Sequence, residues 1–279
     1  MDYTIDGTTK RYVSSGECTY PDYMPKRSDL CQYGCEFEFY IDKKKYVYEE
    51  AIDAITRELQ LLTQADILVD ITSIPKAEDK NRCMQIKPDI SLDDHGVEIS
   101  IPISTKEGVK HYIEVITPII KKYGYTNDET GFHIHISTQQ TDGKHIDFYR
   151  FMLLCEDENL LSSWKPRVGY SQNVMDILSS QTKQQARVIK TKKGTIWNLE
   201  KIDAHHIEIK SIGGVNYHLQ SERITAEFEV YANLFTEAVG EMTQRHKIVL
   251  KKHKEKIDKM PLASKQEFVR ALGESGILQ

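Results

Sequence analysis

The chain has 279 residues, of which 39% are hydrophobic and 28% are charged. These proportions are typical of a folded globular protein rather than a disordered one. Its 37 basic and 42 acidic residues leave a net charge of −5, which gives no sign of a nucleic-acid partner or an anionic membrane. No apolar stretch is long enough to span a bilayer, and the N-terminus lacks the basic and apolar regions of a secretory signal. We therefore expect a cytoplasmic protein.

The five cysteines are odd in number and widely spaced, which argues against a disulfide scaffold. Cys31 and Cys35 leave open a zinc site together with Cys18, although no second closely spaced pair follows. Reduced cysteines in a cytoplasmic protein are the simpler expectation.

Hydrophobic periodicity predicts strands with intervening helices, an α+β pattern with a largely antiparallel sheet. Residues 1–30 contain several turn formers and little periodicity, so we expect an irregular segment there. The elements expected after it are strands over 34–41, 67–71, 84–87, 97–103, 131–137, 194–199 and 206–212, and helices over 46–63, 106–122, 146–161 and 222–260. The second helix contains Pro118, which is expected to kink it or end it early.

Three of these strands carry polar pairs at positions i and i+2. Alternation puts both members of a pair on one face of the strand. The pairs are Glu36 with Glu38, His133 with His135, and Glu208 with Lys210. Burying such groups without partners costs several kcal/mol or more, and a shared divalent cation is the most economical compensation.

The residue types indicate which cation. Carboxylates are hard oxygen ligands that suit Mg²⁺ or Mn²⁺, and imidazole shifts the preference toward Mn²⁺ or Zn²⁺. Glu98 is a further carboxylate on a strand, Asp89 lies at the turn before it, and His206 shares a face with Glu208. This is more than one ion needs, so two or more metals, or metals with a phosphate-bearing substrate, are predicted.

Each residue also has a structural alternative. A histidine on a strand is usually a satisfied core residue, and a glutamate on an alternating strand usually faces solvent. The co-occurrence of acidic and imidazole pairs on several strands favours a site. The chain has no glycine-rich phosphate loop of the usual types, no His-Glu-x-x-His helix and no Gly-x-Ser-x-Gly elbow, so a serine hydrolase is not expected.

Four segments, in order, resemble the amidoligase family, relatives of glutamine synthetase and glutamate–cysteine ligase. Residues 34–39 are similar to the Gly-x-Glu-x-Glu-Phe strand of that family. Residues 89–92 and 96–102 resemble its Asp-Gly-Ser-Leu and Gly-Val-Glu-Ile-x-Ser-Pro pair. Residues 131–137 match its Gly-x-His-x-His-x-Ser strand, and residues 207–210 resemble its late Glu-x-Arg strand. Together the segments span residues 34–212.

The resemblance implies a glutamine-synthetase-like domain, a curved, largely antiparallel sheet with helices packed on its outer face. It also implies ATP bound through two or three Mg²⁺ or Mn²⁺ ions. Carried over by position, the implied metal ligands are Glu36, Glu38, Glu98, His133 and Glu208. His135, Ser137 and Lys210 would lie by the nucleotide or the substrate carboxylate, and Arg167 would hold phosphate or carboxylate. The implied catalytic set is Glu36, Glu38, His133, Glu208 and Arg167.

The implied activity is amide-bond formation in two steps. A carboxylate attacks the γ-phosphate of ATP to give an acyl phosphate, and an amine then displaces the phosphate. The substrates would be small-molecule or peptide carboxylates and amines, whose identity the sequence leaves open, as it does the oligomeric state. One catalytic domain is expected over 31–260, followed by a tail helix over 261–279.

Two positions depart from the family pattern. Lys210 stands where the family usually has arginine, which keeps the positive charge but not the bidentate fork. Ile90 stands where the family usually has glycine, which leaves the role of Asp89 open. Two other functions therefore stay open: a metal-dependent hydrolase or phosphoesterase that uses the Glu/His cluster, and a non-catalytic binding module on the same fold.

Overall fold

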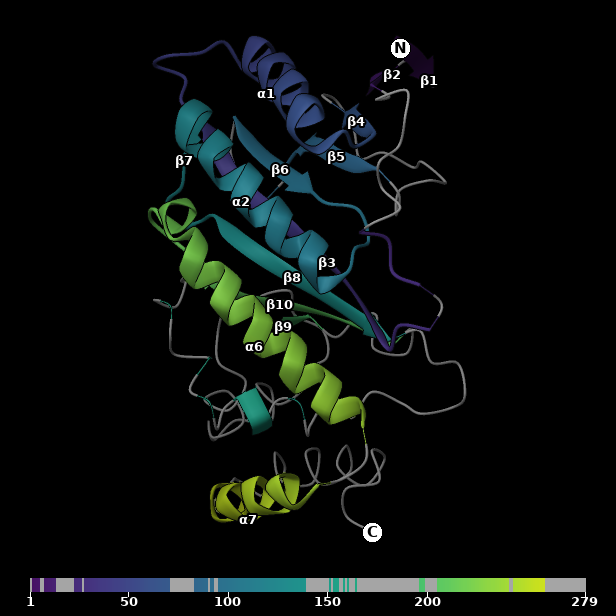
Figure 1. Cartoon of the computed structure of the whole chain (residues 1–279). Helices are drawn as coiled ribbons and strands as arrows, with labels where there is room; N and C mark the ends of the chain where they lie inside the picture. Colours follow the sequence, from purple (N-terminus) through teal and green to yellow (C-terminus); the bar gives the residue numbers. More distant parts are fainter. Residues whose placement is uncertain are drawn as a thin grey trace. The chain divides into compact units, whose positions relative to one another are not determined.

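The computed structural model is a mixed α+β structure (Figure 1). It describes residues 2–5, 8–13, 23–26, 28–70, 83–89, 91–92, 95–138, 151, 153–155, 158, 160, 164, 196–198, 205–240 and 243–258. The strands are β1 (Asp2–Ile5), β2 (Thr8–Val13), β3 (Cys31–Ile41), β4 (Ile67–Asp70), β5 (Met84–Pro88), β6 (Gly96–Ser100), β7 (Gly124–Tyr125), β8 (Gly131–Thr138), β9 (Trp197–Asn198) and β10 (His206–Gly213). The helices are α1 (Tyr48–Thr63), α2 (Lys106–Tyr123), the 3₁₀ turn η4 (Tyr217–Leu219), α6 (Ser221–Val239) and α7 (Gln244–Asp258).

The described strands form one open sheet in the order β1-β2-β4-β5-β6-β3-β8-β10-β9, with β7 paired to β3. The pairs β1–β2, β2–β4, β5–β6, β3–β6, β3–β7 and β9–β10 are antiparallel, and β4–β5 is parallel. The predicted α+β class with a largely antiparallel sheet is therefore confirmed. Within the described residues, no helix combines the length and the apolarity that crossing a membrane requires.

The chain divides into two compact units. Unit 1 consists of residues 1–134 and 212–226, and unit 2 of residues 135–211 and 227–279. The strands β8 and β10 and the helix α6 each contribute residues to both units. The expectation of one catalytic domain over 31–260 stays a prediction.

The core of unit 1 is built from alternate residues of its strands. Phe37 on β3 and Phe132 on β8 are fully buried, and their rings meet edge to face with centroids 4.8 Å apart. Helix α2 packs against β3 and against α1 (Figure 1). Its buried residues recur at helical spacing and include Val109, Ile113, Ile116 and Ile120. The residues between the apolar positions of the strands are thereby left on the opposite face of the sheet.

A side-chain cap marks the start of α2. The Thr105 side chain accepts a hydrogen bond from the Gly108 backbone N–H at 3.3 Å, which satisfies a donor at the helix start. Pro118 lies inside α2 and does not end it, because the helix continues to Tyr123.

The chain then enters β7 at Gly124, where the backbone leaves no room for a side chain. A Cβ there would run into the Tyr40 carbonyl oxygen and lie 2.9 Å from Phe39 Cδ2.

Replacing Gly124 by alanine is therefore expected to lower the free energy of unfolding by about 1–3 kcal/mol, the usual cost of overpacking. Denaturant unfolding followed by circular dichroism measures this loss. The matched control is Gly240→Ala, where the added Cβ meets its nearest atoms at an ordinary 3.5 and 3.6 Å. Equal stabilities for the two variants would contradict the close approach at Gly124.

A buried histidine in unit 1 makes stability depend on pH. A hydrogen bond of 2.9 Å joins His218 Nδ1 to Thr126 Oγ1, and the histidine is 6% exposed. Burial, together with the charge of Lys121, lowers the pKa of His218 below its ordinary 6.5. A lowered pKa means that the folded state disfavours the protonated ring. The stability it contributes is thus present above pH 6.5 and lost as the pH falls through the folded-state pKa.

We expect His218→Asn to reduce the loss of unfolding free energy between about pH 7.5 and pH 5.5, measured by urea titration at each pH. His111→Asn is the control, since it makes the same substitution at another histidine of unit 1. The His111 ring stacks against Tyr23, with ring centroids 5.2 Å apart. If both variants lose as much stability as the unsubstituted protein, His218 does not cause the pH dependence.

The core of unit 2 is aromatic. Phe151 meets Trp197 and Phe235 edge to face, with ring centroids 5.3 and 5.4 Å apart, and all three are buried. Tyr231 on α6 also contacts Trp197 and donates a 2.8 Å hydrogen bond to Ser211 Oγ. Since Trp197 belongs to β9, this cluster anchors β9 beside β10.

Three expectations need correction. The N-terminal segment expected to be irregular contains the strands β1 and β2, which pair with each other, and β2 also pairs with β4. The single helical region expected over 222–260 is two helices, α6 and α7, interrupted around Gly240. Strand β3 begins at Cys31 rather than at residue 34. Most of the helix expected over 146–161, and the tail over 261–279, lie outside the described residues.

The described cysteines, Cys31, Cys35, Cys83 and Cys155, are buried and form no disulfide with one another. Burial, together with the charge of Glu36, raises the pKa of the Cys35 thiol well above its ordinary value. This thiol is therefore unreactive at neutral pH. Cys18 lies outside the described residues.

Candidate functional site

The strands of unit 1 place a row of charged side chains on one face of the sheet. In the antiparallel register of β3 with β6, Glu38 lies directly opposite Glu98, and Glu36 lies opposite Ser100. On the next strand, Lys87 of β5 lies opposite Glu98. Directly opposite residues of a sheet share a face, so these side chains form one polar surface. Two carboxylates in register repel each other, and either a nearby cation or protonation of one of them relieves this repulsion.

His133 is held between the two glutamates of β3. Its Nδ1 lies 3.3 Å from Glu36 Oε2, and its Nε2 lies 3.3 Å from Glu38 Oε1. Glu38 and His133 are buried, at 6% and 5% exposed, whereas Glu36 is half-buried. The other Glu38 oxygen accepts a 2.8 Å hydrogen bond from the Gly131 N–H, and the Tyr217 hydroxyl donates to the Glu38 backbone carbonyl at 2.8 Å. The carboxylate of Glu38 is therefore fixed in place.

Glu98 is an acid of this surface whose pKa is strongly perturbed. Burial, and then the charge of Glu36, raises its pKa to about 7, while Lys87 and a hydrogen bond from Ser100 act in the opposite direction. Lys87 Nζ lies 2.8 Å from Glu98 Oε1, and Ser100 Oγ donates to the same oxygen at 2.5 Å. The carboxyl is thus poised to change its protonation near neutral pH.

Sequence reasoning did not single out Lys87, although the alternation along β5 puts it on the polar face. Burial alone lowers the pKa of this lysine, but the charges of Glu98, Glu36 and Asp89 outweigh that effect and raise it. Lys87 is therefore a half-buried ammonium that stays charged at neutral pH. It supplies positive charge where the sequence predicted only acids and imidazoles.

In unit 2, β10 carries the predicted pair Glu208 and Lys210. Lys210 Nζ lies 3.1 Å from Glu208 Oε1, and the Asn198 amide donates to Glu208 Oε2 at 2.6 Å. Asn198 lies opposite Glu208 in the β9–β10 register, so the aromatic anchoring of β9 also positions this amide. Asn198 is a second residue that the sequence analysis did not identify.

Unit 2 also contains the second histidine of β8. His135 Nδ1 lies 3.1 Å from His206 Nε2, and the ring centroids are 5.2 Å apart. Ser137 follows two residues later on β8 and is half-buried.

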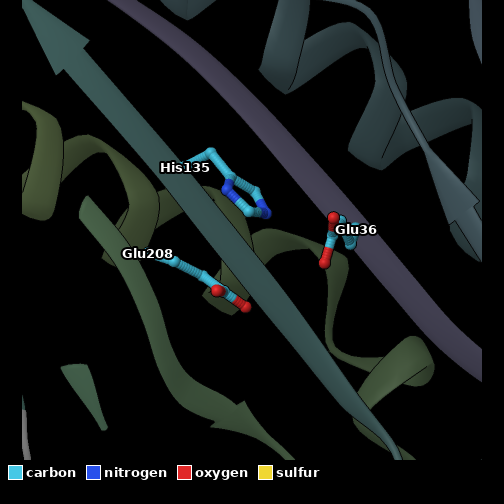
Figure 2. A group of neighbouring side chains, drawn as sticks. All are labelled: Glu36, His135 and Glu208. Atoms are coloured by element: carbon cyan, nitrogen blue, oxygen red, sulfur yellow. The ribbon is translucent and has the colours of Figure 1, made fainter. Parts of the chain in front are cut away.

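Two of the predicted residues of unit 2 offer ligand atoms that lie close together. A nitrogen of His135 on β8 and a carboxylate oxygen of Glu208 on β10 lie within 4.8 Å of each other (Figure 2). Carboxylate oxygens with one imidazole nitrogen suit a divalent cation such as Mn²⁺ or Mg²⁺.

Two further predicted residues are Asp89, which the structure describes, and Arg167, which it does not. Asp89 is 9% exposed, and its Oδ1 accepts hydrogen bonds of 2.7 Å from both the backbone N–H and the hydroxyl of Ser91. Asp89 therefore closes a turn before β6. Arg167 lies outside the described residues.

Comparison with known proteins gives distant structural neighbours. No protein-family model and no curated protein matches the chain. A Plasmodium falciparum glutamine synthetase is similar at 11% identity and a TM-score of 0.39, over 75% of this chain and 52% of that one. Two structures of GmaS, one without ligand and one with ADP, are each 12% identical, with TM-scores of 0.31 and 0.34. They match over 89% of this chain and 64% and 65% of theirs. This chain spans about half the length of the glutamine synthetase.

Proposed function

We propose that the protein is an ATP-dependent carboxylate–amine ligase that works with Mg²⁺ or Mn²⁺ through an acyl phosphate. The observation that carries the proposal is the buried imidazole of His133 between Glu36 and Glu38, with Glu98 opposite Glu38 on the next strand. The order of the four motifs that resemble the amidoligase family supports it further.

The donor set fits divalent cations. In unit 1, Glu36, Glu38 and Glu98 offer carboxylate oxygens, and His133 offers a nitrogen on the same face as the two β3 glutamates. In unit 2, Glu208 offers a further carboxylate. Oxygen-rich sets with an imidazole accommodate Mn²⁺ and, with phosphate oxygens added, Mg²⁺. When bound, two or three such ions would neutralise the charge that develops on the transferring phosphoryl group.

Other residues of the chain would bind the nucleotide and the substrate carboxylate. Lys87 and Lys210 are cations beside the candidate carboxylates and would attract the phosphates of ATP. His135 and Ser137 would contact the nucleotide or the substrate carboxylate, and Arg167 would hold phosphate or carboxylate. A substrate carboxylate oxygen would attack the γ-phosphorus while ADP leaves. The nitrogen of an amine would then attack the acyl carbon, lose a proton and release inorganic phosphate.

A thermal-shift titration with ATP, in Mg²⁺ and in EDTA, tests the proposal. A ligand that binds only the folded state raises the melting temperature. We expect ATP to stabilise the protein in Mg²⁺ and not in EDTA, and ADP release then to depend on an added carboxylate and amine. Stabilisation by metal without an effect of ATP, together with metal-stimulated ester cleavage, would replace the ligase with a phosphoesterase-type hydrolase. No response to metal or ATP would leave a non-catalytic binding module.

A further inference from the structure

The polar row of β3 continues past the candidate metal ligands and ends in an aromatic pair. Glu38 and Tyr40 are two residues apart, so their side chains share one face of the strand. Tyr40 lies directly opposite Tyr125 in the β3–β7 register, which puts Tyr125 on that face as well. The two rings stack with their centroids 5.5 Å apart. Because Tyr40 is 3% exposed and Tyr125 is 43% exposed, the pair presents one aromatic ring to solvent.

A carboxylate is fixed beside this pair. The Tyr40 hydroxyl donates a 2.7 Å hydrogen bond to Glu129 Oε2, and the Asn127 amide donates to the same oxygen at 3.3 Å. Glu129 is exposed, and these two donors hold its carboxylate in one orientation. The chain also limits its distance from the metal-binding face. Gly131 donates its N–H to Glu38 Oε2 at 2.8 Å, and the Cα atoms of Glu129 and Gly131 are at most about 7 Å apart.

An aromatic ring and a carboxylate together suit an organic ammonium group. The ring attracts a cation through its quadrupole, and the carboxylate accepts a charge-assisted hydrogen bond from it. The phosphates of ATP would be repelled by Glu129 and attracted by Lys87. Lys87 lies on β5, whereas Glu129 precedes β8, and β6 and β3 lie between those two strands in the sheet. The phosphates and an ammonium group would therefore be drawn to opposite sides of β3.

The ammonium held at Glu129 cannot be the nitrogen that forms the amide. An attacking nitrogen needs its lone pair, which a protonated amine lacks. It must also reach the acyl phosphate beside the candidate ligands of β3, whereas Glu129 lies beyond the end of that row. One substrate meets both requirements if it carries two nitrogens on a flexible chain, comparable to the four-carbon stem of a lysine side chain.

We infer that Tyr125 and Glu129, linked by Tyr40, bind the second ammonium group of the amine substrate, and that this substrate is a diamine. The inference deepens the proposed function and rests on it, because it names the class of the amine.

The test compares putrescine with n-butylamine, which has the same four-carbon chain and only one nitrogen. Binding to the full chain is measured by isothermal titration calorimetry in EDTA at neutral pH. Putrescine can then pair with Glu129 and with the β3 carboxylates at once, whereas n-butylamine can pair with only one of them. We expect putrescine to bind about 10- to 100-fold more tightly, the range of one hydrogen bond to a charged group.

Glu129→Gln should weaken putrescine binding by about 10- to 100-fold, to near the level of n-butylamine. Tyr125→Leu should weaken it by about 2- to 5-fold, because the leucine side chain has no ring to attract the cation. The matched control is Glu114→Gln, at an exposed glutamate of α2, which should keep the affinity for putrescine. Unchanged putrescine binding in Glu129→Gln, or equal binding of the two amines by the unsubstituted protein, would overturn the inference.

A second measurement needs no variant. In the unsubstituted protein, putrescine should shift the ring ¹H–¹³C resonances of Tyr125, and unchanged resonances would count against the site. The ATP thermal shift in Mg²⁺ separates this inference from the proposed function. An ATP response without Glu129-dependent binding of putrescine rejects only the inference. Glu129-dependent binding without an ATP response rejects only the ligase and keeps the diamine site.

Discussion

The Glu36→Gln variant is expected to lose ATP-dependent ADP release by about 10²- to 10³-fold while remaining folded, since losing one group that stabilises developing charge typically has a cost of this size. Glu36 is half-buried, and its Oε2 lies 3.3 Å from His133 Nδ1. Glutamine keeps the shape of the glutamate side chain but removes the negative charge that attracts a cation. The measurement is steady-state ADP release at saturating Mg²⁺, with urea unfolding as a check on the fold.

Glu58→Gln is the matched control for this acid-to-amide change. Glu58 on α1 pairs at 2.8 Å with the exposed Lys122 and accepts a 3.0 Å hydrogen bond from the Tyr123 hydroxyl, so its loss weakens contacts with α2 and not with the charged surface of the sheet. Activity should remain at the unsubstituted level. Wild-type activity in Glu36→Gln would remove Glu36 from the catalytic machinery, and equal losses in both variants would point to a general effect on the fold.

The second large effect concerns stability. Lys87→Met is expected to lower the free energy of unfolding by about 3–5 kcal/mol near pH 8 in EDTA, because it leaves the carboxylate of Glu98 buried without its partner. The two side chains are only 13% and 11% exposed, so water replaces the lost ammonium poorly. Urea unfolding followed by circular dichroism measures the loss.

The pH dependence of this variant tests the cause. The pKa of Glu98 is already raised to about 7, mainly by burial and by Glu36, and removing Lys87 removes a charge that holds it down. A raised carboxyl pKa gives stability that is present below the ordinary value of 4.5 and lost as the pH rises through the folded-state pKa. The deficit of Lys87→Met should therefore shrink between about pH 8 and pH 5.

Adding Glu98→Gln to Lys87→Met should restore much of the stability near pH 8, because the double variant buries no charge at this position. The amide oxygen of the introduced glutamine can still accept the hydrogen bond from Ser100. A deficit in Lys87→Met that is independent of pH, or a double variant no more stable than the single one, would mean that lost packing of the lysine chain is responsible.

Period-two alternation explains why much of the fold could be predicted. The Glu36–Glu38 and His133–His135 pairs sit on long strands, where the alternation is unambiguous, and the helices α1 and α2 follow their apolar spacing closely. Short strands such as β1 and β2 carry too little periodicity to be recognised. They exist because β1 pairs with β2 and β2 pairs with β4, which is a tertiary effect.

The same reasoning explains what was missed at the site. Pattern reading singles out residues that are unusual where they stand, such as a glutamate on a core strand. Lys87 on a short strand and Asn198 beside Trp197 are ordinary in sequence. Their importance comes from register, which places each beside a particular carboxylate. Register depends on which strands lie side by side in the sheet, and the order of the residues does not show this.

Each of the two lysine–glutamate pairs, Lys87 with Glu98 in unit 1 and Lys210 with Glu208 in unit 2, neutralises a candidate ligand from within the chain. Folding therefore need not wait for an ion, in contrast to small zinc domains that are unfolded without one. The protein would fold first without metal and bind its cations afterwards. Chelation would then return it to the folded, metal-free state, which can bind cations again.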